Sequence, residues 1–100
     1  MDSDAETDVE RLRKELKSNH PPSVVDIREP VELSAEPAMA GALELPMTQL
    51  MARMAELPMD KPIVLVCASG SRSLVAQRFL SARGYAVKSL AGGMAAWHAN

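Results

Sequence analysis

The sequence of 100 residues contains one cysteine and 3% aromatic residues, and it has no long apolar run. A single cysteine cannot form a disulfide within the chain, and it does not suggest a structural zinc site. No segment approaches the roughly 18 apolar residues of a membrane-spanning helix. The formal net charge of −2 gives no electrostatic reason to expect nucleic acid or a membrane surface as a partner. We therefore expect a reduced, cytoplasmic protein.

Length and composition indicate one compact domain. Hydrophobic residues make up 47% of the chain, which is typical of a globular protein. Residues 1–6 are acidic, lack the basic and apolar segments of a signal peptide, and predict a flexible leader. The domain itself is expected over residues 7–100. We expect a monomer, although the sequence does not determine the oligomeric state.

Helical and strand patterns alternate along the domain. Strands are predicted over residues 24–27, 42–45, 63–66 and 85–90, and helices after Thr7, Thr48, Gly70 and Gly93. Residues 30–42 predict a loop that could include a helical turn near residues 31–34. The alternation indicates an α/β fold with an open, mainly parallel sheet of four or five strands, flanked by helices on both faces.

The helix boundaries and core faces follow from caps and spacing. Thr7 and Glu10 fit a capping box, and Thr48 is a candidate cap for the next helix. Spacing predicts that several side chains of the later helices point inward, namely Met51, Met54, Leu74, Val75 and Phe79. Met39, Met47 and Met59 are expected to fill gaps rather than to line a cleft.

Cys67 directly follows the unbroken apolar run of residues 63–66, which predicts a central strand covered on both faces. In a parallel sheet, ligands sit at the carboxyl ends of the strands. The small residues after Cys67 let the backbone curl with its N–H groups inward, and Gly70 can take a positive φ without strain. Such a curl, followed by a helix N-terminus, favours a thiolate.

Cys67 could also be a small buried hydrophobe at the end of a strand. The composition of the loop instead favours a nucleophile. Arg72 could orient an anionic donor or could pin the loop by pairing with a carbonyl or an acidic neighbour. The candidate site consists of the catalytic Cys67 and the substrate-binding residues Ala68, Ser69, Gly70, Ser71, Arg72 and Ser73.

Three segments of the chain resemble the rhodanese-like sulfurtransferases. Residues 67–73 resemble the active-site loop of that family, residues 26–30 its early Asp-x-Arg-Glu-Pro segment, and residues 90–97 its closing Gly-Gly and tryptophan segment. The resemblance implies an open α/β domain without metal or organic cofactor. It also implies that Cys67 takes a sulfur atom from thiosulfate or a persulfide, forms a persulfide, and passes the sulfur to cyanide or a thiol, which could belong to a protein.

Other functions have distinct sequence requirements. Related cysteine-dependent phosphatases use Cys-x5-Arg, whereas four residues separate Cys67 from Arg72 here, so we expect little phosphatase activity. Ala68 stands where some thiosulfate-specific members have a basic residue, which favours a neutral or protein-borne persulfide as donor. Residues 37–42 keep only the last two residues of the family's Gly-His-Ile-Pro-Gly-Ala segment. The alternatives are a protein-specific sulfur carrier or interaction module, and an inactive binding scaffold.

The remaining candidates favour structural roles. His20 and His98 have no partner at catalytic spacing and are expected at the surface. Asp26 and Arg28 are expected to tie the first strand to neighbouring loops, and Trp97 to act as a hydrophobic plug.

Overall fold

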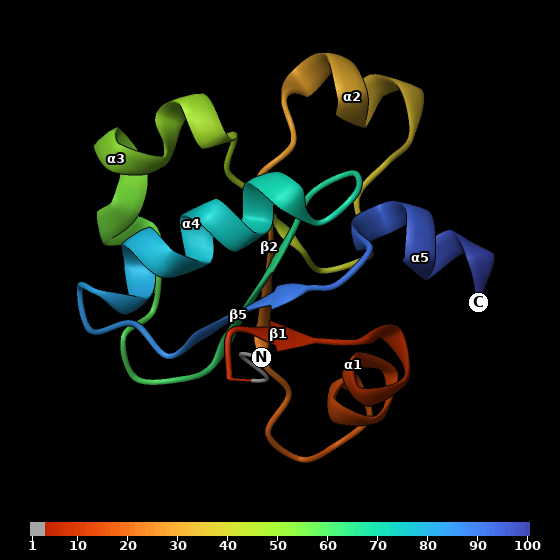
Figure 1. The fold of residues 1–100 in the computed structure, drawn as a ribbon, viewed down its shortest axis with the longest axis horizontal. Helices are drawn as coiled ribbons and strands as arrows, with labels where there is room; N and C mark the ends of the chain where they lie inside the picture. The colour runs from red at the N-terminus through yellow and green to blue at the C-terminus, as the bar shows by residue number, and fades with distance from the viewer. Residues whose placement is uncertain (1–3) are drawn as a thin grey trace.

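The computed structural model describes residues 4–100 and contains one sheet of five parallel strands in the order β1-β5-β4-β2-β3 (Figure 1). The strands are β1 (Glu6–Thr7), β2 (Ser23–Asp26), β3 (Leu43–Glu44), β4 (Ile63–Val66) and β5 (Val87–Leu90). The helices are α1 (Val9–Leu16), α2 (Pro30–Ala35), α3 (Leu50–Arg53), α4 (Ser71–Ser81) and α5 (Gly93–Ala99), with 3-10 turns at Met47–Gln49 and Met54–Glu56. The predicted open parallel α/β sheet is confirmed.

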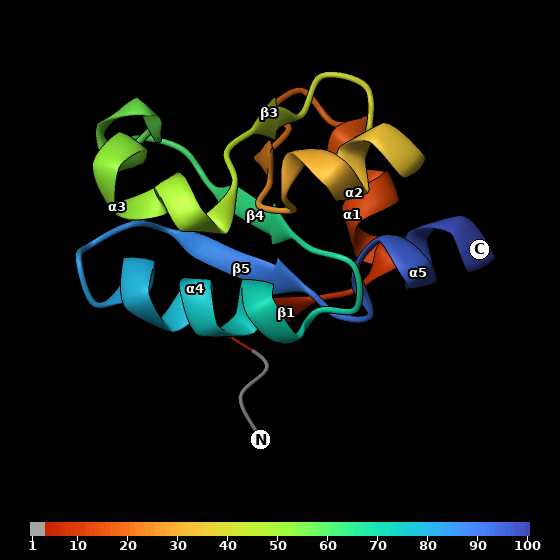
Figure 2. The same cartoon turned by 90° about the horizontal axis from the view of Figure 1, so that it is seen from above.

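The sheet is covered on both faces, and successive residues of β4 serve different faces. Ile63, Leu65 and Cys67 belong to a core that includes Ala76 and Leu80 of α4. On the other face, two valines of β4 pack in a second core with α1 and α5. Figures 1 and 2 show α4 and α1 on opposite sides of the central strands. Burial on both faces explains why β4 is an unbroken apolar run.

The first strand begins earlier than the sequence predicts. Glu6 and Thr7 pair with β5, and Ala5 is buried, so part of the expected leader is built into the sheet. Residues 1–3 lie outside the described part of the chain. The cap of α1 is Asp8, whose Oδ1 accepts a hydrogen bond from the Arg11 N–H at 2.8 Å, and the prediction of Thr7 as cap is wrong.

Tertiary packing also overturns three predictions for the middle helices. Val75 and Met51 are exposed by 58% and 71%, so neither points into the core. Thr48 lies within a 3-10 turn instead of capping α3, and its hydroxyl donates to Glu29 Oε1 at 2.9 Å. In contrast, Met39 and Met47 pack against the two cores as expected of gap-filling residues. Met59 is exposed.

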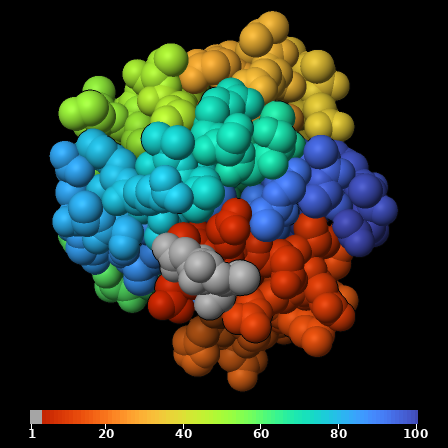
Figure 3. Space-filling model, viewed as in Figure 1, coloured from red at the N-terminus to blue at the C-terminus, as the bar shows by residue number. Residues whose placement is uncertain are grey.

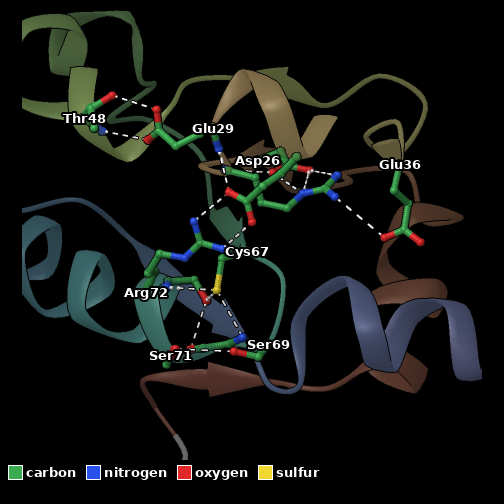
Figure 4. Close-up of polar contacts among 12 residues, drawn as sticks. Asp26, Glu29, Glu36, Thr48, Cys67, Ser69, Ser71 and Arg72 are labelled. Atoms are coloured by element: carbon green, nitrogen blue, oxygen red, sulfur yellow. Dashed lines mark hydrogen bonds and ion pairs between the residues drawn. The ribbon is translucent and has the colours of Figure 1, made fainter. Parts of the chain in front are cut away.

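Residues 30–35, predicted as part of a loop, form α2. Pro30 occupies the first turn, where its missing N–H removes no helical hydrogen bond. The Glu32 carboxylate accepts a hydrogen bond from the Glu29 N–H at 2.9 Å and caps the helix. Glu29, which precedes this short helix, and Glu32, which belongs to it, place their carboxylates near the end of the sheet that carries Cys67 (Figure 4). Within residues 4–100, no helix combines the length and apolarity required to cross a bilayer.

Candidate active site at Cys67

Cys67 lies immediately after β4, and its side chain belongs to the core shared with α4. The residue is fully buried. In Figure 3 the surface of the following loop, in teal, lies between the orange surface of α2 and the blue surface of α5. Three segments that are distant in sequence therefore meet at the loop that follows the cysteine.

The loop turns its backbone N–H groups toward the sulfur. The N–H of Gly70 donates to Sγ at 3.1 Å and that of Ser73 at 3.3 Å (Figure 4). Gly70 has a φ of +99°, which allows this curl and which other residue types rarely adopt. This is the inward-facing backbone predicted for the small residues of the loop.

These contacts lower the pKa of the Cys67 thiol. Burial by itself raises the pKa, but hydrogen bonds from the Ser73 side chain and from the backbone of Ser73, Gly70 and Ser69 outweigh it. The negative sulfur thus receives several donors without contact with bulk water. Such an environment favours the thiolate, which is the nucleophilic form of cysteine.

Gly92, the N-cap of α5, and Gly93, its first residue, bring the first turn of this helix against the cysteine loop. The N–H of Met94 donates to the Cys67 carbonyl at 2.8 Å, and that of Ala95 donates to the Ala68 carbonyl at 3.0 Å. A side chain at Gly93 would place its Cβ 2.3 Å from the Cys67 carbonyl oxygen. The Gly-Gly segment therefore lets α5 hold the backbone on which the nucleophile sits.

Arg72 pairs with Glu32 of α2. Its guanidinium donates to the two carboxylate oxygens at 2.8 and 2.7 Å (Figure 4). Pairing with Arg72 lowers the pKa of Glu32 to about 2, and the carboxylate in turn raises the pKa of Arg72. Arg72 therefore has the second of its two expected roles in this structure, since its guanidinium holds the loop against an acidic neighbour.

The early Asp-x-Arg segment forms a second ion pair beneath α2. Asp26 and Arg28 are both buried and joined by hydrogen bonds of 2.9 to 3.2 Å. The guanidinium also lies 3.7 Å from Glu36, which in turn lies 3.4 Å from Nε2 of His98. Through Glu36 the pair ties the end of β2 to the loop that follows α2, as expected, and within residues 4–100 neither residue forms a hydrogen bond with the Cys67 sulfur.

The candidate residues share the loop but differ in orientation. Gly70 and Ser73 are buried against the sulfur, whereas Ser69 and Ser71 are exposed, with their hydroxyls 3.4 Å apart. Ala68 and Arg72 are half-buried. His20 and His98 are exposed, and Trp97 packs against the second core beneath the Arg13 guanidinium, 4.1 Å from its ring centre.

Two residues next to the site were not predicted. Glu32 could have been found from the sequence, because Pro30 at the first helical turn followed by a glutamate is a helix-start pattern. Ser89 lies on β5, and its hydroxyl is 2.6 Å from that of Ser73. Its sequence neighbourhood contains no signal for this contact, which only the pairing of β5 with β4 creates.

Comparison with known proteins decides the family. The family model described as "Rhodanese-like domain" matches residues 8–100. The chain belongs to the rhodanese-like domain family. A protein named sulfurtransferase from Allochromatium vinosum is 41% identical over 93 residues, which cover 92% of this chain and 86% of that protein. This rhodanese-like domain is therefore similar in sequence to a sulfurtransferase over nearly its whole length.

Solved structures agree with this assignment of the rhodanese-like domain. A rhodanese-related protein from Thermoplasma volcanium superposes with a TM-score of 0.86 at 29% identity, covering 95% of this chain and 91% of that one. A rhodanese-like domain protein from Staphylococcus aureus gives a TM-score of 0.87 at 26% identity, covering 93% of this chain and 90% of that one.

Proposed function

We propose that this rhodanese-like domain is a sulfurtransferase that carries a sulfur atom on Cys67. The observation that supports the proposal most directly is the set of hydrogen bonds that the loop backbone donates to Sγ. They favour a thiolate in the resting protein and offer donors to an anionic persulfide after sulfur has been accepted. A reducing compartment favours a free thiol between turnovers, and the proposal therefore includes a cytoplasmic location.

The reaction would have two balanced steps. In the first, the Cys67 thiolate attacks the outer sulfur of the donor, a new S–S bond forms, and the donor's S–S bond breaks. Its electron pair leaves with sulfite when the donor is thiosulfate, or with a thiolate when the donor is a persulfide. In the second step a thiol or cyanide attacks the outer sulfur of the Cys67 persulfide, and the Cys67 thiolate leaves.

The charges around the loop favour a donor of low charge. Arg72 is the only basic residue in the loop of residues 67–73, and both of its terminal nitrogens are engaged by Glu32. Ala68 adds no positive charge. The thiosulfate dianion would have to compete with the Glu32 carboxylate for Arg72, whereas a neutral or singly charged persulfide would not. We therefore expect a higher KM for thiosulfate than for a cysteine persulfide, and a KM for thiosulfate in the low micromolar range would contradict this.

Intact mass tests the sulfur-carrying step itself. After incubation with a persulfide donor and removal of the excess, the wild type should gain the mass of one sulfur atom, which cyanide then removes as thiocyanate. Cys67→Ser should gain nothing, while Ser81→Ala, altered at an exposed hydroxyl at the far end of α4, should still gain the sulfur atom. Absence of any gain in the wild type with every sulfane donor would support an inactive scaffold.

The burial of Cys67 favours a second candidate, a carrier specific for a protein partner. A sulfur without exposed surface reacts slowly with small molecules unless the loop opens, and a docked protein could supply that opening. Comparing turnover of thiosulfate and cyanide with sulfur transfer from a protein persulfide separates the two. A carrier would be slow in the first assay and fast in the second.

A further inference from the structure

The buried hydroxyl groups of Ser73 and Ser89 form a chain of contacts that begins at the Cys67 sulfur. The Ser73 Oγ is 3.4 Å from Sγ and 2.6 Å from the Ser89 Oγ. Both serines have no exposed surface. The distance between the hydroxyls is that of a strong O–H···O hydrogen bond. Ser89 belongs to β5 and not to the cysteine loop, so the contact joins the loop to the centre of the sheet.

Burial decides which of the two hydroxyls donates. A buried hydroxyl proton needs an acceptor, and leaving it unpaired is costly. Within residues 4–100, Ser73 Oγ is the only hydrogen-bond partner of the Ser89 hydroxyl. Ser73 has two other partners, the Gly70 carbonyl at 3.2 Å and the Cys67 sulfur. The Ser89 hydroxyl therefore donates to Ser73, and the proton of Ser73 remains directed toward the loop.

We infer that Ser89 is a positioning residue, which acts on Cys67 by holding the Ser73 hydroxyl as a donor toward the loop. In the thiol form, Ser73 accepts from Ser89 and from the thiol and donates to the Gly70 carbonyl. When the thiol loses its proton, the Ser73 hydroxyl turns its own proton to the sulfur. The Gly70 carbonyl still accepts from the Leu74 N–H at 3.2 Å, so this rotation of the Ser73 hydroxyl leaves no acceptor without a partner.

This inference deepens the proposed function. The effect of Ser89 on the thiolate is independent of that function, and only its consequence for sulfur transfer rests on it. The elements packed around the loop carry several titratable or charged groups, namely Arg72 and Arg78 of α4, Lys88 of β5, His98 of α5, Glu29 and Glu32 at the start of α2, and the Asp26–Arg28 pair at the end of β2. Substitution of Ser89 alters none of these charges. A change in the titration of Cys67 would therefore report on the hydroxyl pair.

The test measures the ultraviolet absorbance of the Cys67 thiolate as a function of pH, without any sulfur donor, because this readout does not require the buried sulfur to meet a reagent. Ser89→Ala should raise the midpoint by about half a pH unit, because Ser73 loses the bond that polarises its hydroxyl. Ser73→Ala should raise it by about one pH unit, because a direct donor to the sulfur is lost. The double variant should titrate like Ser73→Ala alone, since Ser89 acts only through Ser73.

A matched pair separates the hydroxyl from the shape of the side chain. S89T and S89V have the same shape and suit a strand, but only S89T keeps the hydroxyl. S89T should titrate like the wild type and S89V like S89A, with urea unfolding used to verify that each variant is folded. Equal midpoints in S89T and S89V, or additive shifts in the double variant, would overturn the inference. Loss of sulfur transfer with the expected midpoints intact would count against the proposed function alone.

Discussion

Removal of the charge on Glu32 tests how the cysteine loop is fastened to α2. The Glu32→Gln substitution keeps the size of the side chain but removes the carboxylate that accepts two hydrogen bonds from Arg72. A fall of the Glu32 pKa from 4.5 to about 2 corresponds to about 3 kcal/mol of stability. Because the two side chains are 36% and 30% exposed, solvent screening reduces this to about 1 to 2 kcal/mol.

The sign of the pH dependence follows from the lowered pKa. The folded protein holds Glu32 charged to a lower pH than the unfolded chain does, so the stabilisation is complete above about pH 4.5 and is lost as the pH falls toward 2. At pH 7, E32Q should therefore be about 1 to 2 kcal/mol less stable than the wild type in urea unfolding. At pH 3, more than half of this difference should have disappeared.

Glu44→Gln serves as the matched control, since Glu44 is an exposed carboxylate of β3 outside the pair with Arg72. It should change stability by less than about 0.5 kcal/mol at either pH. The reasoning would be refuted if E32Q lost the same stability at pH 3 as at pH 7, or if E32Q and E44Q behaved alike. In addition, the release of Arg72 in E32Q should lower the KM for thiosulfate several-fold, whereas E44Q should leave it unchanged.

Two further substitutions test how α5 is held. Gly93→Ala should cost about 3 kcal/mol or more in urea unfolding, because its Cβ would lie 2.3 Å from the Cys67 carbonyl oxygen. Gly41→Ala, also at a positive φ but with open space around it, should cost about 1 kcal/mol, and equal costs would contradict the proposed close approach. Arg13→Lys should increase acrylamide quenching of the single tryptophan, Trp97. The reason is that Arg13 stacks on the Trp97 ring and donates to the backbone oxygens of Trp97 and Asn100. Unchanged quenching would show that α5 is held without Arg13.

The elements with strong local signals were predicted correctly. The strand at residues 63–66 has an apolar run that only burial on both faces explains, and the structure places it in the middle of the sheet. The loop after it contains small residues and a glycine that permits a positive φ, and its backbone does turn toward Sγ. In both cases the physical cause lies within a few consecutive residues.

Predictions that required knowledge of the neighbours were less accurate. The spacing of Val75 and Met51 is compatible with a core face, but α3 and α4 turn other residues to the sheet and leave these two exposed. Thr48 has the chemistry of a helix cap, yet the Glu29 carboxylate of a distant segment takes its hydroxyl. Helical spacing describes one helix and contains no information on the position of its partners.

Local patterns of residues were enough to predict the alternation of strands and helices, the place of Cys67 at the carboxyl end of a buried strand, and the glycines that allow the loop to curl. These properties depend on side-chain size, apolarity and backbone freedom, which are local. Three contacts became apparent only in the folded protein: Arg72 pairs with Glu32, α5 donates to the carbonyl of Cys67, and the Ser89 hydroxyl contacts that of Ser73. Hydrogen bonds and ion pairs act over a few ångströms, so which groups are paired depends on how distant segments are brought together by the sheet.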